Sequence, residues 1–431
     1  QFGVRLGKKT HIICTTTPRP KDLIVDLIGR EGDDVVLTEE ESRMSLSPAE
    51  LFADARAWAD IDGWERSALA LHEHGGIHRV EAPGFRPFWA VIDHAAVMDV
   101  ERRAMVFHNA PRPVLGSLEQ EAKRQRELKA DVIEEALQRM AGIERRVDVE
   151  SVEGDNESNG LGYRTRIQLH VNEFGDAGPY MERSHDVVLV RDLPLALEEI
   201  REAGLHSKNW SGVKKIDISA SNTGQLQWKV DEKIKGDERL VERAAGRTFR
   251  ISGGGFWQVH RKAADLLAKT VLDMIDDAGF NKSANNLDLY GGVGLFASSL
   301  ASHFGNETQV TTVEAFKRAT EDATLNIADM PKAKAVCAQV DRFLQDQQRA
   351  MQQGASFKDA TVVLDPPRAG AGAKVVGLLV DLAPQQIVYV ACDPVALARD
   401  LKALLAGGYE IAAFRAFDLF PHTHHVEAVV S

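Results

Sequence analysis

Short apolar runs and longer segments with one apolar face alternate through the C-terminal part of the chain. The runs have strand length, and the segments between them carry apolar residues three and four positions apart, as amphipathic helices do. The expected strands lie at residues 285–290, 309–315, 333–339, 360–367, 386–394, 412–420 and 425–430. Apolar strands that alternate with helices are typical of a parallel sheet covered on both faces. The pattern therefore predicts an α/β fold for residues 251–431.

The preceding part of the chain shows three other patterns. Residues 1–45 have short apolar runs separated by Pro, Gly and Asp, which predicts a small antiparallel β-barrel. Residues 46–115 show no sustained period and stay unassigned. Residues 116–250 begin with apolar positions at helical spacing, from Leu118 to Met140, and a central α+β domain is expected after this helix. Its expected elements are strands at 163–171, 185–192, 214–221 and 225–230 and one helix around 195–203.

The composition is that of a soluble protein with two or three domains. The chain has 431 residues, 44% hydrophobic and 27% charged, whereas single cores seldom grow beyond roughly 250–300 residues. It contains no run of about 18 apolar residues, so no membrane span is expected. The N-terminal segment lacks the pattern of a secretory signal. Three cysteines far apart in sequence argue against a disulfide framework or a zinc ribbon. We therefore expect a cytoplasmic protein and a monomer.

The net charge of −12 counts against nonspecific binding of nucleic acid, but two groups of basic residues are locally dense. Four of them fall between Lys123 and Lys129. Arg164 and Arg166 alternate along an expected strand, which places both on one face. These residues predict a basic surface that contacts a phosphate backbone. The alternative is that they form ordinary solvated faces.

A glycine-rich turn follows the first expected strand of the α/β region. Tyr290 ends that strand, and Gly291, Gly292 and Gly294 lead into a helix. Glycines in such a turn let the backbone approach a ligand beside the helix N-terminus, although many sheets have such a turn for packing alone. Acidic residues follow the next two strands, where Glu314 is placed to bind ribose hydroxyls and Asp341 an adenine amino group.

The length of this turn bears on the cofactor. The turn reads GGVG and matches the GxGxxG pattern of pyrophosphate cofactors only loosely. A donor without phosphates, S-adenosylmethionine, fits a shorter turn better. A nicotinamide or flavin cofactor, or a purely structural turn, stays open on these residues.

Three further residues carry candidate chemistry. Asp365 follows an apolar strand and precedes two prolines, at the edge where α/β sheets bind ligands, although it could also cap a helix. Cys392 follows another such strand and is either a nucleophile or buried filler. Glu427 lies in an apolar strand, where burial raises the pKa of a carboxyl and suits it to act as a general base. The neighbouring histidines 422, 424 and 425 favour a turn or substrate-edge role over a metal site.

Several motifs occur together, in order, between residue 250 and the end of the chain: FWQVH, DLYGGVGLF, TTVEA, LDPPRAG, YVACDP and DLFPHTHHVEAVV. In this set the chain resembles the S-adenosylmethionine-dependent RNA uracil-C5 methyltransferases, which form 5-methyluridine in tRNA or 23S rRNA. The resemblance implies a Rossmann-like class I methyltransferase domain, with Cys392 as nucleophile and Glu427 as general base. It also implies that Gln258, Tyr290, Glu314, Asp341 and Asp365 surround the cofactor and the target base.

The reaction that the resemblance implies makes Gln258 and Asp365 candidates to bind the polar edge of the uracil. More weakly, residues 116–250 resemble the family's RNA-contacting domain, and residues 1–45 a TRAM barrel. Two positions depart from the family pattern, because Asp393 and His260 stand where Asn is frequent. The cysteines that hold an iron–sulfur cluster in some members are absent, so no cluster is expected. A methyltransferase for another base or a small molecule, or an inactive RNA-binding relative, remains the alternative.

Overall fold

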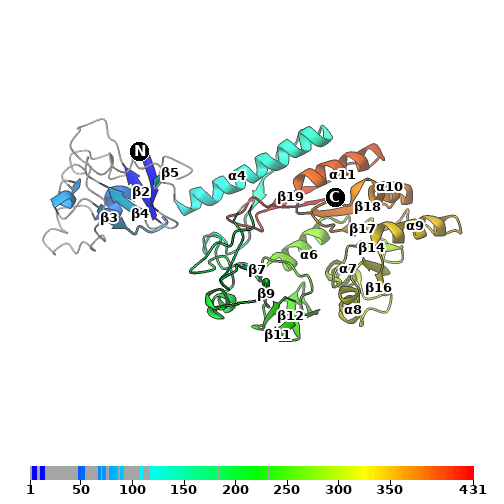
Figure 1. Cartoon of the computed structure of the whole chain (residues 1–431). Helices are drawn as coiled ribbons and strands as arrows, with labels where there is room; N and C mark the ends of the chain where they lie inside the picture. The colour runs from blue at the N-terminus through cyan, green and yellow to red at the C-terminus, as the bar shows by residue number, and fades with distance from the viewer. Residues whose placement is uncertain are drawn as a thin grey trace. The chain divides into compact units, whose positions relative to one another are not determined.

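The chain separates into two compact units, residues 1–123 and residues 124–431. Figure 1 shows the helices and strands of both units. The computed structural model describes residues 2–6, 10–14, 47–53, 67–68, 70–73, 77–85, 88–91, 107–109, 117–181, 184–231 and 233–431.

In the N-terminal unit, the described strands form a sheet in the order β3-β4-β2-β1-β5. The strands are β1 (Phe2–Leu6), β2 (Thr10–Cys14), β3 (Ile77–Val80), β4 (Phe88–Val91) and β5 (Phe107–Asn109), and a short helix α1 (Pro48–Ala53) accompanies them. The sheet thus joins strands from the range 1–45 with strands from the range 46–115, where the sequence suggested no element. Most of the barrel expected over residues 1–45 lies outside the described residues, and the domain limits remain predictions.

A sheet with the strand order β16-β15-β14-β17-β18-β20-β19-β6 forms the centre of the C-terminal unit. Its strands are β6 (Val149–Glu150), β14 (Asn286–Leu289), β15 (Val310–Glu314), β16 (Ala333–Cys337), β17 (Thr361–Leu364), β18 (Gln386–Ala391), β19 (Phe414–Phe417) and β20 (Glu427–Val430). Strands β14 to β18 pair in parallel, whereas β20 is antiparallel to β18 and β19. The predicted α/β fold with a central parallel sheet is confirmed.

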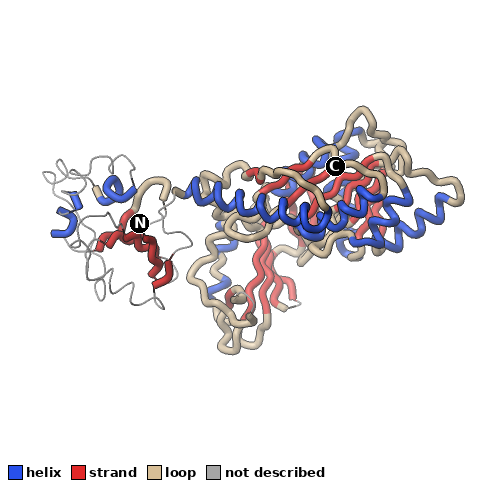
Figure 2. The backbone as a smooth tube through the Cα atoms, turned by 90° about the horizontal axis from the view of Figure 1, so that it is seen from above, coloured by secondary structure: helices blue, strands red, loops and turns tan. Residues whose placement is uncertain are grey.

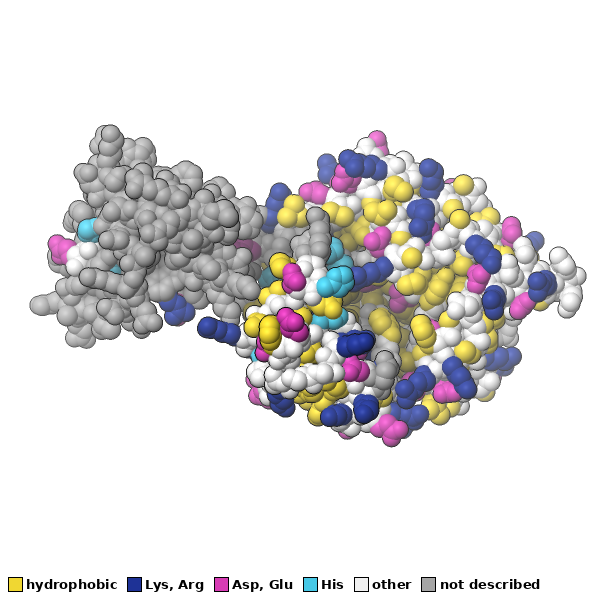
Figure 3. Space-filling view, in the orientation of Figure 1, with side chains coloured by type: hydrophobic (Ala, Val, Ile, Leu, Met, Phe, Trp, Pro, Cys, Tyr) yellow, Lys and Arg dark blue, Asp and Glu magenta, His cyan; other side chains and the backbone are white. Residues whose placement is uncertain are grey.

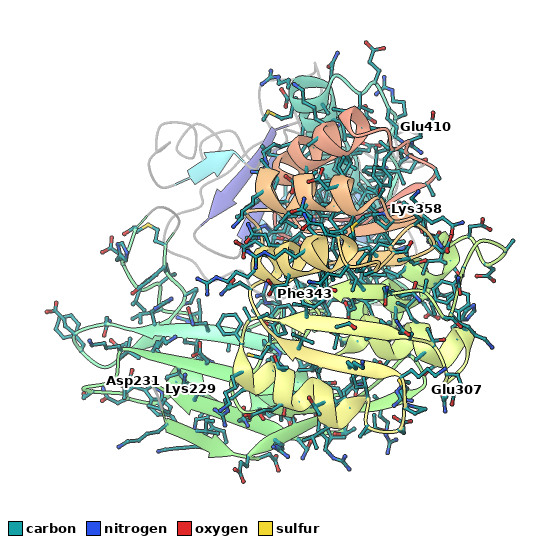
Figure 4. The ribbon with its side chains drawn as sticks, turned by 90° about the vertical axis from the view of Figure 1, so that its right-hand side faces the viewer. Lys229, Asp231, Glu307, Phe343, Lys358 and Glu410 are labelled. Carbon is teal, nitrogen blue, oxygen red and sulfur yellow. The ribbon has the colours of Figure 1, made fainter. Side chains whose placement is uncertain are left out.

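Helices cover both faces of this sheet (Figure 2). They are α4 (Leu118–Ala136), α6 (Ala263–Met274), α7 (Leu295–Phe304), α8 (Lys317–Asn326), α9 (Val340–Met351), α10 (Gly372–Leu382) and α11 (Pro394–Ala406). Successive strand residues enter opposite cores: Val362 packs with α9, α10 and α11, whereas Val363 packs with α6 and α7. This alternation explains why all residues of β17, and all of β18 after Gln386, are buried. Helix α10 packs between α9, which carries Phe343, and α11 (Figure 4).

Helix α4 starts at a capping box, in which the Ser117 and Gln120 side chains each accept the other's backbone N–H. The helix continues into a π-helical turn, η3 (Leu137–Ala141). Its buried stripe is narrower than predicted, because Ile133 and Leu137 are buried but Leu128 and Val132 are each 48% exposed.

A smaller sheet of order β11-β10-β9-β7-β8 lies beside the large one in the same unit. Its strands are β7 (Arg166–Val171), β8 (Ala177–Gly178), β9 (Lys215–Ala220), β10 (Leu226–Val230) and β11 (Lys233–Gly236), accompanied by helix α5 (Glu198–Glu202) and turn η4 (Leu205–Ser207). Lys229 and Asp231 mark one tip of it (Figure 4). A separate two-stranded sheet is formed by β12 (Arg239–Ala244) and β13 (Arg247–Ser252). The strand predicted at 185–192 is wrong, since this segment makes only one isolated bridge, from Val187 to Tyr180.

Candidate active site

Most of the residues predicted for catalysis and cofactor binding lie at the carboxyl edge of the large sheet, where its parallel strands end. The glycine turn between β14 and α7 has an unusual backbone: φ is +62° at Tyr290, +53° at Gly292 and +88° at Gly294. Left-handed φ values suit glycine but are costly for tyrosine. The turn therefore holds the Tyr290 side chain in a strained backbone conformation at the sheet edge.

Gly291 is required for a different reason, because its φ is not left-handed. A Cβ there would lie 1.9 Å from Thr312 Oγ1 and 2.6 Å from Asp288 Oδ2. Only a glycine lets the turn pack so closely on β14 and β15. Asp288 itself is fully buried and accepts the Ala297 N–H at 3.0 Å, and burial raises its pKa to about 6. The turn thus has a packing role beside any ligand role.

Glu314 reaches the same turn from the end of β15. Its Oε2 accepts the Gly292 N–H at 3.1 Å, and its Oε1 accepts the Phe316 N–H at 2.8 Å. The Phe316 ring next to it is 77% exposed. A carboxylate beside a close backbone turn and an exposed aromatic ring can accept ribose hydroxyls and stack on a purine, so this donor set fits a nucleoside-type cofactor.

Asp341 lies in the first turn of α9 and pairs with Lys374 of α10, with 2.6 Å between Oδ2 and Nζ. The hydrogen bond from Lys374 lowers the pKa of Asp341. The charge of Asp341 also contributes, after burial and Asp400, to raising the pKa of Tyr290 to about 12. The structure thus brings Asp341 near Tyr290, while its contact with an adenine remains a prediction.

Asp365 follows β17, and its backbone N–H donates to the Leu289 carbonyl at 3.2 Å. Burial raises the pKa of Asp365 to about 7, the charge of Asp288 adds to this, and a hydrogen bond with the Gln258 side chain opposes it. Gln258 is held from the central domain, since Thr165 Oγ1 donates to its carbonyl at 3.0 Å. The two residues predicted for the uracil edge are therefore in contact.

Strand pairing brings Cys392 to Glu427. Strand β18 is antiparallel to β20 with Ala391 opposite Ala428. Cys392 directly follows Ala391, the last residue of β18, and Glu427 directly precedes Ala428 as the first residue of β20, so the two side chains lie at the same end of the paired strands. Residues far apart in the chain thus become neighbours across two strands.

Burial dominates the electrostatics of this pair. It raises the pKa of the half-buried Cys392 thiol to about 12, to which the charges of Glu427 and Asp365 add, while Arg368 acts in the opposite direction. Burial also raises the pKa of Glu427 well above its usual value, with the charge of Asp365 as a second cause. Asp393 caps α11 by accepting the Ala396 N–H at 2.8 Å. The capping role of this segment is therefore compatible with a Cys392 thiol located beside Glu427.

Arg368 belongs to a quoted motif, but sequence reasoning gave it no role. Its Nη2 donates to His425 Nε2 at 3.3 Å. Burial and then the Arg368 charge lower the pKa of His425 to about 4, so this ring is a neutral acceptor at pH 7. The feature of the sequence that could have pointed to Arg368 is its position three residues after Asp365, which places a cation near the candidate carboxylate. Arg368 is the positive group that supports ionisation of Cys392.

The other histidines make internal contacts. His422 Nε2 donates to the Asn159 carbonyl at 2.7 Å. His260 is buried, with Nε2 at 3.1 Å from both Asp155 oxygens and its ring stacked on Tyr163. In the described part of the chain, no group of three or more His, Cys, Asp or Glu side chains is arranged to hold a metal ion.

The two arginines predicted to contact RNA have different surroundings. Arg164 is half-buried, and its Nε lies 3.4 Å from the Arg166 carbonyl that accepts its hydrogen bond. The Arg166 guanidinium is largely enclosed: Nη1 donates to the Gly255 carbonyl at 2.7 Å, and Nε and Nη2 are buried without a partner among the described residues. Contact of either arginine with RNA remains a prediction, and the enclosure of Arg166 favours Arg164 as the one that contacts phosphate.

The surface of the C-terminal unit is hollowed on the face shown in Figure 3, with hydrophobic side chains exposed in the hollow and Lys, Arg and His side chains along its edges. Among the described helices, none is long and apolar enough to cross a membrane. The sheet, the close glycine turn and the thiol beside a buried carboxylate define an α/β enzyme with a nucleoside-type cofactor site.

Comparison with known proteins gives the family. The family model for tRNA (uracil-5-)-methyltransferases matches residues 237–431. A protein of Streptomyces avermitilis, described as an uncharacterized RNA methyltransferase, is 40% identical over 341 residues, which are 71% of this chain and 76% of that protein. A similarly described protein of Streptomyces coelicolor is 38% identical over 341 residues, 71% of this chain and 72% of that protein.

Among solved structures, the tRNA (uracil-54, C5)-methyltransferase of Pyrococcus abyssi in complex with S-adenosyl-L-homocysteine shares the fold, with a TM-score of 0.55 at 22% identity. The match covers 82% of this chain and 91% of that one. The chain belongs to the S-adenosylmethionine-dependent RNA uracil-C5 methyltransferases. It is an RNA methyltransferase of this family, with S-adenosylmethionine as its cofactor.

Proposed function

We propose that this enzyme methylates carbon 5 of one specific uridine in tRNA or 23S rRNA, through a covalent bond between Cys392 and carbon 6 of the uracil. The observation that carries the proposal is the pairing of β18 with β20, which brings Cys392, the residue after β18, close enough to Glu427 at the start of β20 for the Glu427 charge to act on the thiol. A nucleophile and a base on adjacent strands can act on neighbouring atoms of one small ring.

The residues that would hold S-adenosylmethionine are the turn from Tyr290 to Gly294, the carboxylates of Glu314 and Asp341, and the exposed ring of Phe316. The bound donor supplies a methyl group on a sulfonium, which is electrophilic. The turn and Glu314 fit the nucleoside part of such a donor because the Gly292 N–H already orients the carboxylate.

Cys392 begins the reaction. Its thiol gives its proton to Asp365, the second carboxylate that acts on it, so that Glu427 stays ionised for the later step. The sulfur bonds to carbon 6 of the uracil while the electrons of the 5,6 double bond move toward the carbonyl at carbon 4. Burial and two carboxylates oppose this ionisation, because they raise the pKa of the thiol to about 12. The positive charge of Arg368 favours it.

Glu427 completes the reaction after carbon 5 has been methylated. Its carboxylate takes the proton from carbon 5, the electrons re-form the 5,6 double bond, and the bond to Cys392 breaks. A buried carboxylate with a raised pKa is a stronger base than an exposed one once it is ionised. Elimination therefore releases 5-methyluridine and the thiolate of Cys392, which takes back the proton that it lost in the first step.

Gln258 and Asp365 would bind the polar edge of the base, since they already contact each other at the sheet edge. An amide beside a carboxyl can pair with the carbonyl and N–H groups of uracil and stabilise charge on its oxygen. The uridine has to leave its stack to reach the thiol.

The test is nucleoside mass spectrometry of tRNA and 23S rRNA after incubation with enzyme and labelled donor. We expect labelled 5-methyluridine in one of the two RNAs and none with Cys392→Ala. RNA that contains 5-fluorouracil lacks the proton that Glu427 removes, so it should stay bound to the protein on a denaturing gel. Label in another nucleoside, or full methylation by Cys392→Ala, would contradict the proposal.

A further inference from the structure

Lys129 is buried, although it is the last residue of the basic group from Lys123 to Lys129, for which the sequence predicted an exposed surface. Its side chain is 5% exposed, and Nζ lies 2.5 Å from Asp418 Oδ1. Nζ also donates to the Phe420 carbonyl at 3.0 Å. Burial lowers the pKa of Lys129, while the charge of Asp418 opposes that change. A buried ammonium needs such partners, since water does not reach it.

Both partners belong to the segment 418–426 that joins β19 to β20. Strand β19 ends at Phe417 and β20 begins at Glu427, and these two residues are paired. Asp418 thus directly follows the residue opposite the proposed base. The anchor that Lys129 provides is therefore placed where the segment leaves the sheet.

A second side chain of α4 holds the same segment one helical turn earlier. Gln125 Oε1 accepts the His422 N–H at 2.9 Å, and Gln125 Nε2 lies 3.4 Å from His422 Nδ1. Residues four apart lie on one face of a helix, so α4 holds the segment at two points. From the other side, the Tyr163 hydroxyl donates to the Pro421 carbonyl at 3.2 Å.

We infer that Lys129 is a positioning residue for the proton-abstraction step: by holding Asp418 and the Phe420 carbonyl, it fixes the segment from which Glu427 enters β20. The inference rests on the proposed function of Glu427. The side chains of α4 that hold the segment bond to Asp418, Phe420 and His422, and addition of Cys392 and methyl transfer require no proton transfer to Glu427. Loss of the anchor should slow elimination specifically.

The first experiment uses Lys129→Met in the full chain, which keeps most of the stem and removes the charge and its donors. With unmodified RNA, we expect kcat to fall by about 100-fold, the loss that a base misplaced by about 1 Å can cause, with KM for S-adenosylmethionine unchanged. Protein bound covalently to already methylated RNA should accumulate.

A double variant separates positioning from stability. Lys129→Met leaves the buried Asp418 carboxylate without its cation, whereas Lys129→Met with Asp418→Asn leaves no buried charge unpaired. The double variant should regain thermal stability and keep the slow elimination. If the double variant recovered the elimination rate as well as thermal stability, the inference would be overturned. A wild-type rate of elimination in Lys129→Met would also overturn it. The control is Lys269→Met, which breaks a Lys–Asp contact of 2.5 Å on the exposed face of α6.

A second readout needs neither RNA nor donor. Alkylation of Cys392 by iodoacetamide, followed over pH by peptide mass spectrometry, reports the charge of Glu427 beside the thiol. If Lys129→Met displaces Glu427, the midpoint should move to lower pH, as with Glu427→Gln. An unchanged midpoint would overturn the inference. Failure of the wild type to form 5-methyluridine would instead overturn the proposed function, while this readout would still decide whether Lys129 positions Glu427.

Discussion

Arg166 Nη1 donates a hydrogen bond of 2.7 Å to the carbonyl of Gly255, three residues before Gln258. Burial lowers the pKa of Arg166 to about 10, and the charge of Glu242 opposes the change. An arginine that the sequence places on an RNA-facing strand is therefore tied to the segment that carries a proposed uracil ligand. Because of this contact, we expect Arg166 to hold this segment and Arg164 to contact RNA.

We expect Arg164→Ala and Arg166→Ala to differ in their effect on RNA binding. A phosphate contact releases counterions, so the logarithm of affinity falls against the logarithm of salt by roughly 0.7 to 0.9 per contact. Arg164→Ala should flatten this slope. Arg166→Ala should leave the slope unchanged and lower kcat, since it frees the Gly255–Gln258 segment. Equal slopes for wild type and Arg164→Ala would exclude Arg164 as a phosphate contact.

Glu427→Gln should stop the reaction after methyl transfer. The amide cannot take the carbon 5 proton, so we expect turnover to fall by about 100- to 10,000-fold and a covalent complex with methylated RNA to accumulate. Denaturing gels with RNA labelled through the donor measure this complex. Glu410→Gln, at an exposed position, is the matched control. Normal turnover by Glu427→Gln would require another base.

Arg368→Met should make the thiol harder to ionise. Arg368 is the positive group that opposes the raised pKa of Cys392, so its removal should shift alkylation of Cys392 to higher pH by roughly one unit. Glu427→Gln should shift it to lower pH, because that change removes a negative charge. Arg349→Met, in an exposed pair with Asp346, should change nothing. A shift to lower pH in Arg368→Met would contradict the assigned electrostatics.

Asp365→Asn should stabilise the fold at pH 8 and leave it unchanged at pH 4. The pKa of Asp365 is raised to about 7 in the folded protein, so the folded state holds a proton that the unfolded state has released. Stability therefore falls as pH rises from the unfolded pKa to the folded one, by about 1.4 kcal/mol for each unit of difference. The asparagine has no proton to lose. Urea unfolding at both pH values, with a gain of at least about 1 kcal/mol at pH 8 only, checks this.

Gly291→Ala and Gly292→Ala should destabilise the turn for different reasons. The methyl group at Gly291 would meet Thr312 Oγ1 at 1.9 Å, and we expect a loss of about 1–3 kcal/mol from overpacking. At Gly292 a Cβ meets nothing within 4 Å, but φ is +53°, which costs about 1–2 kcal/mol. Adding Thr312→Ala should recover part of the lost stability for Gly291→Ala alone, because the contact of 2.6 Å with Asp288 Oδ2 stays. Equal recovery in both would contradict the packing argument.

The sequence by itself determined the local elements of the catalytic half. Apolar runs of strand length, separated by amphipathic segments, correctly predicted the parallel strands β14 to β18 and the helices between them, because period and turn residues act over a few neighbouring positions. The same reasoning failed at 185–192, an apolar run without a neighbouring strand along its length. A strand requires a partner, and the sequence of the segment alone does not say whether one is present.

Tertiary structure decided which of the candidate groups meet and which face solvent. The pairing of β18 with β20 brings Cys392, which follows β18, near Glu427 at the start of β20, and burial then raises the pKa of both side chains. Lys129 and Arg166 resemble other surface cations in sequence, yet both are enclosed and hold internal carbonyls. Charge and spacing are local properties, whereas strand register and burial depend on residues distant in the chain, and only the folded protein brings these together.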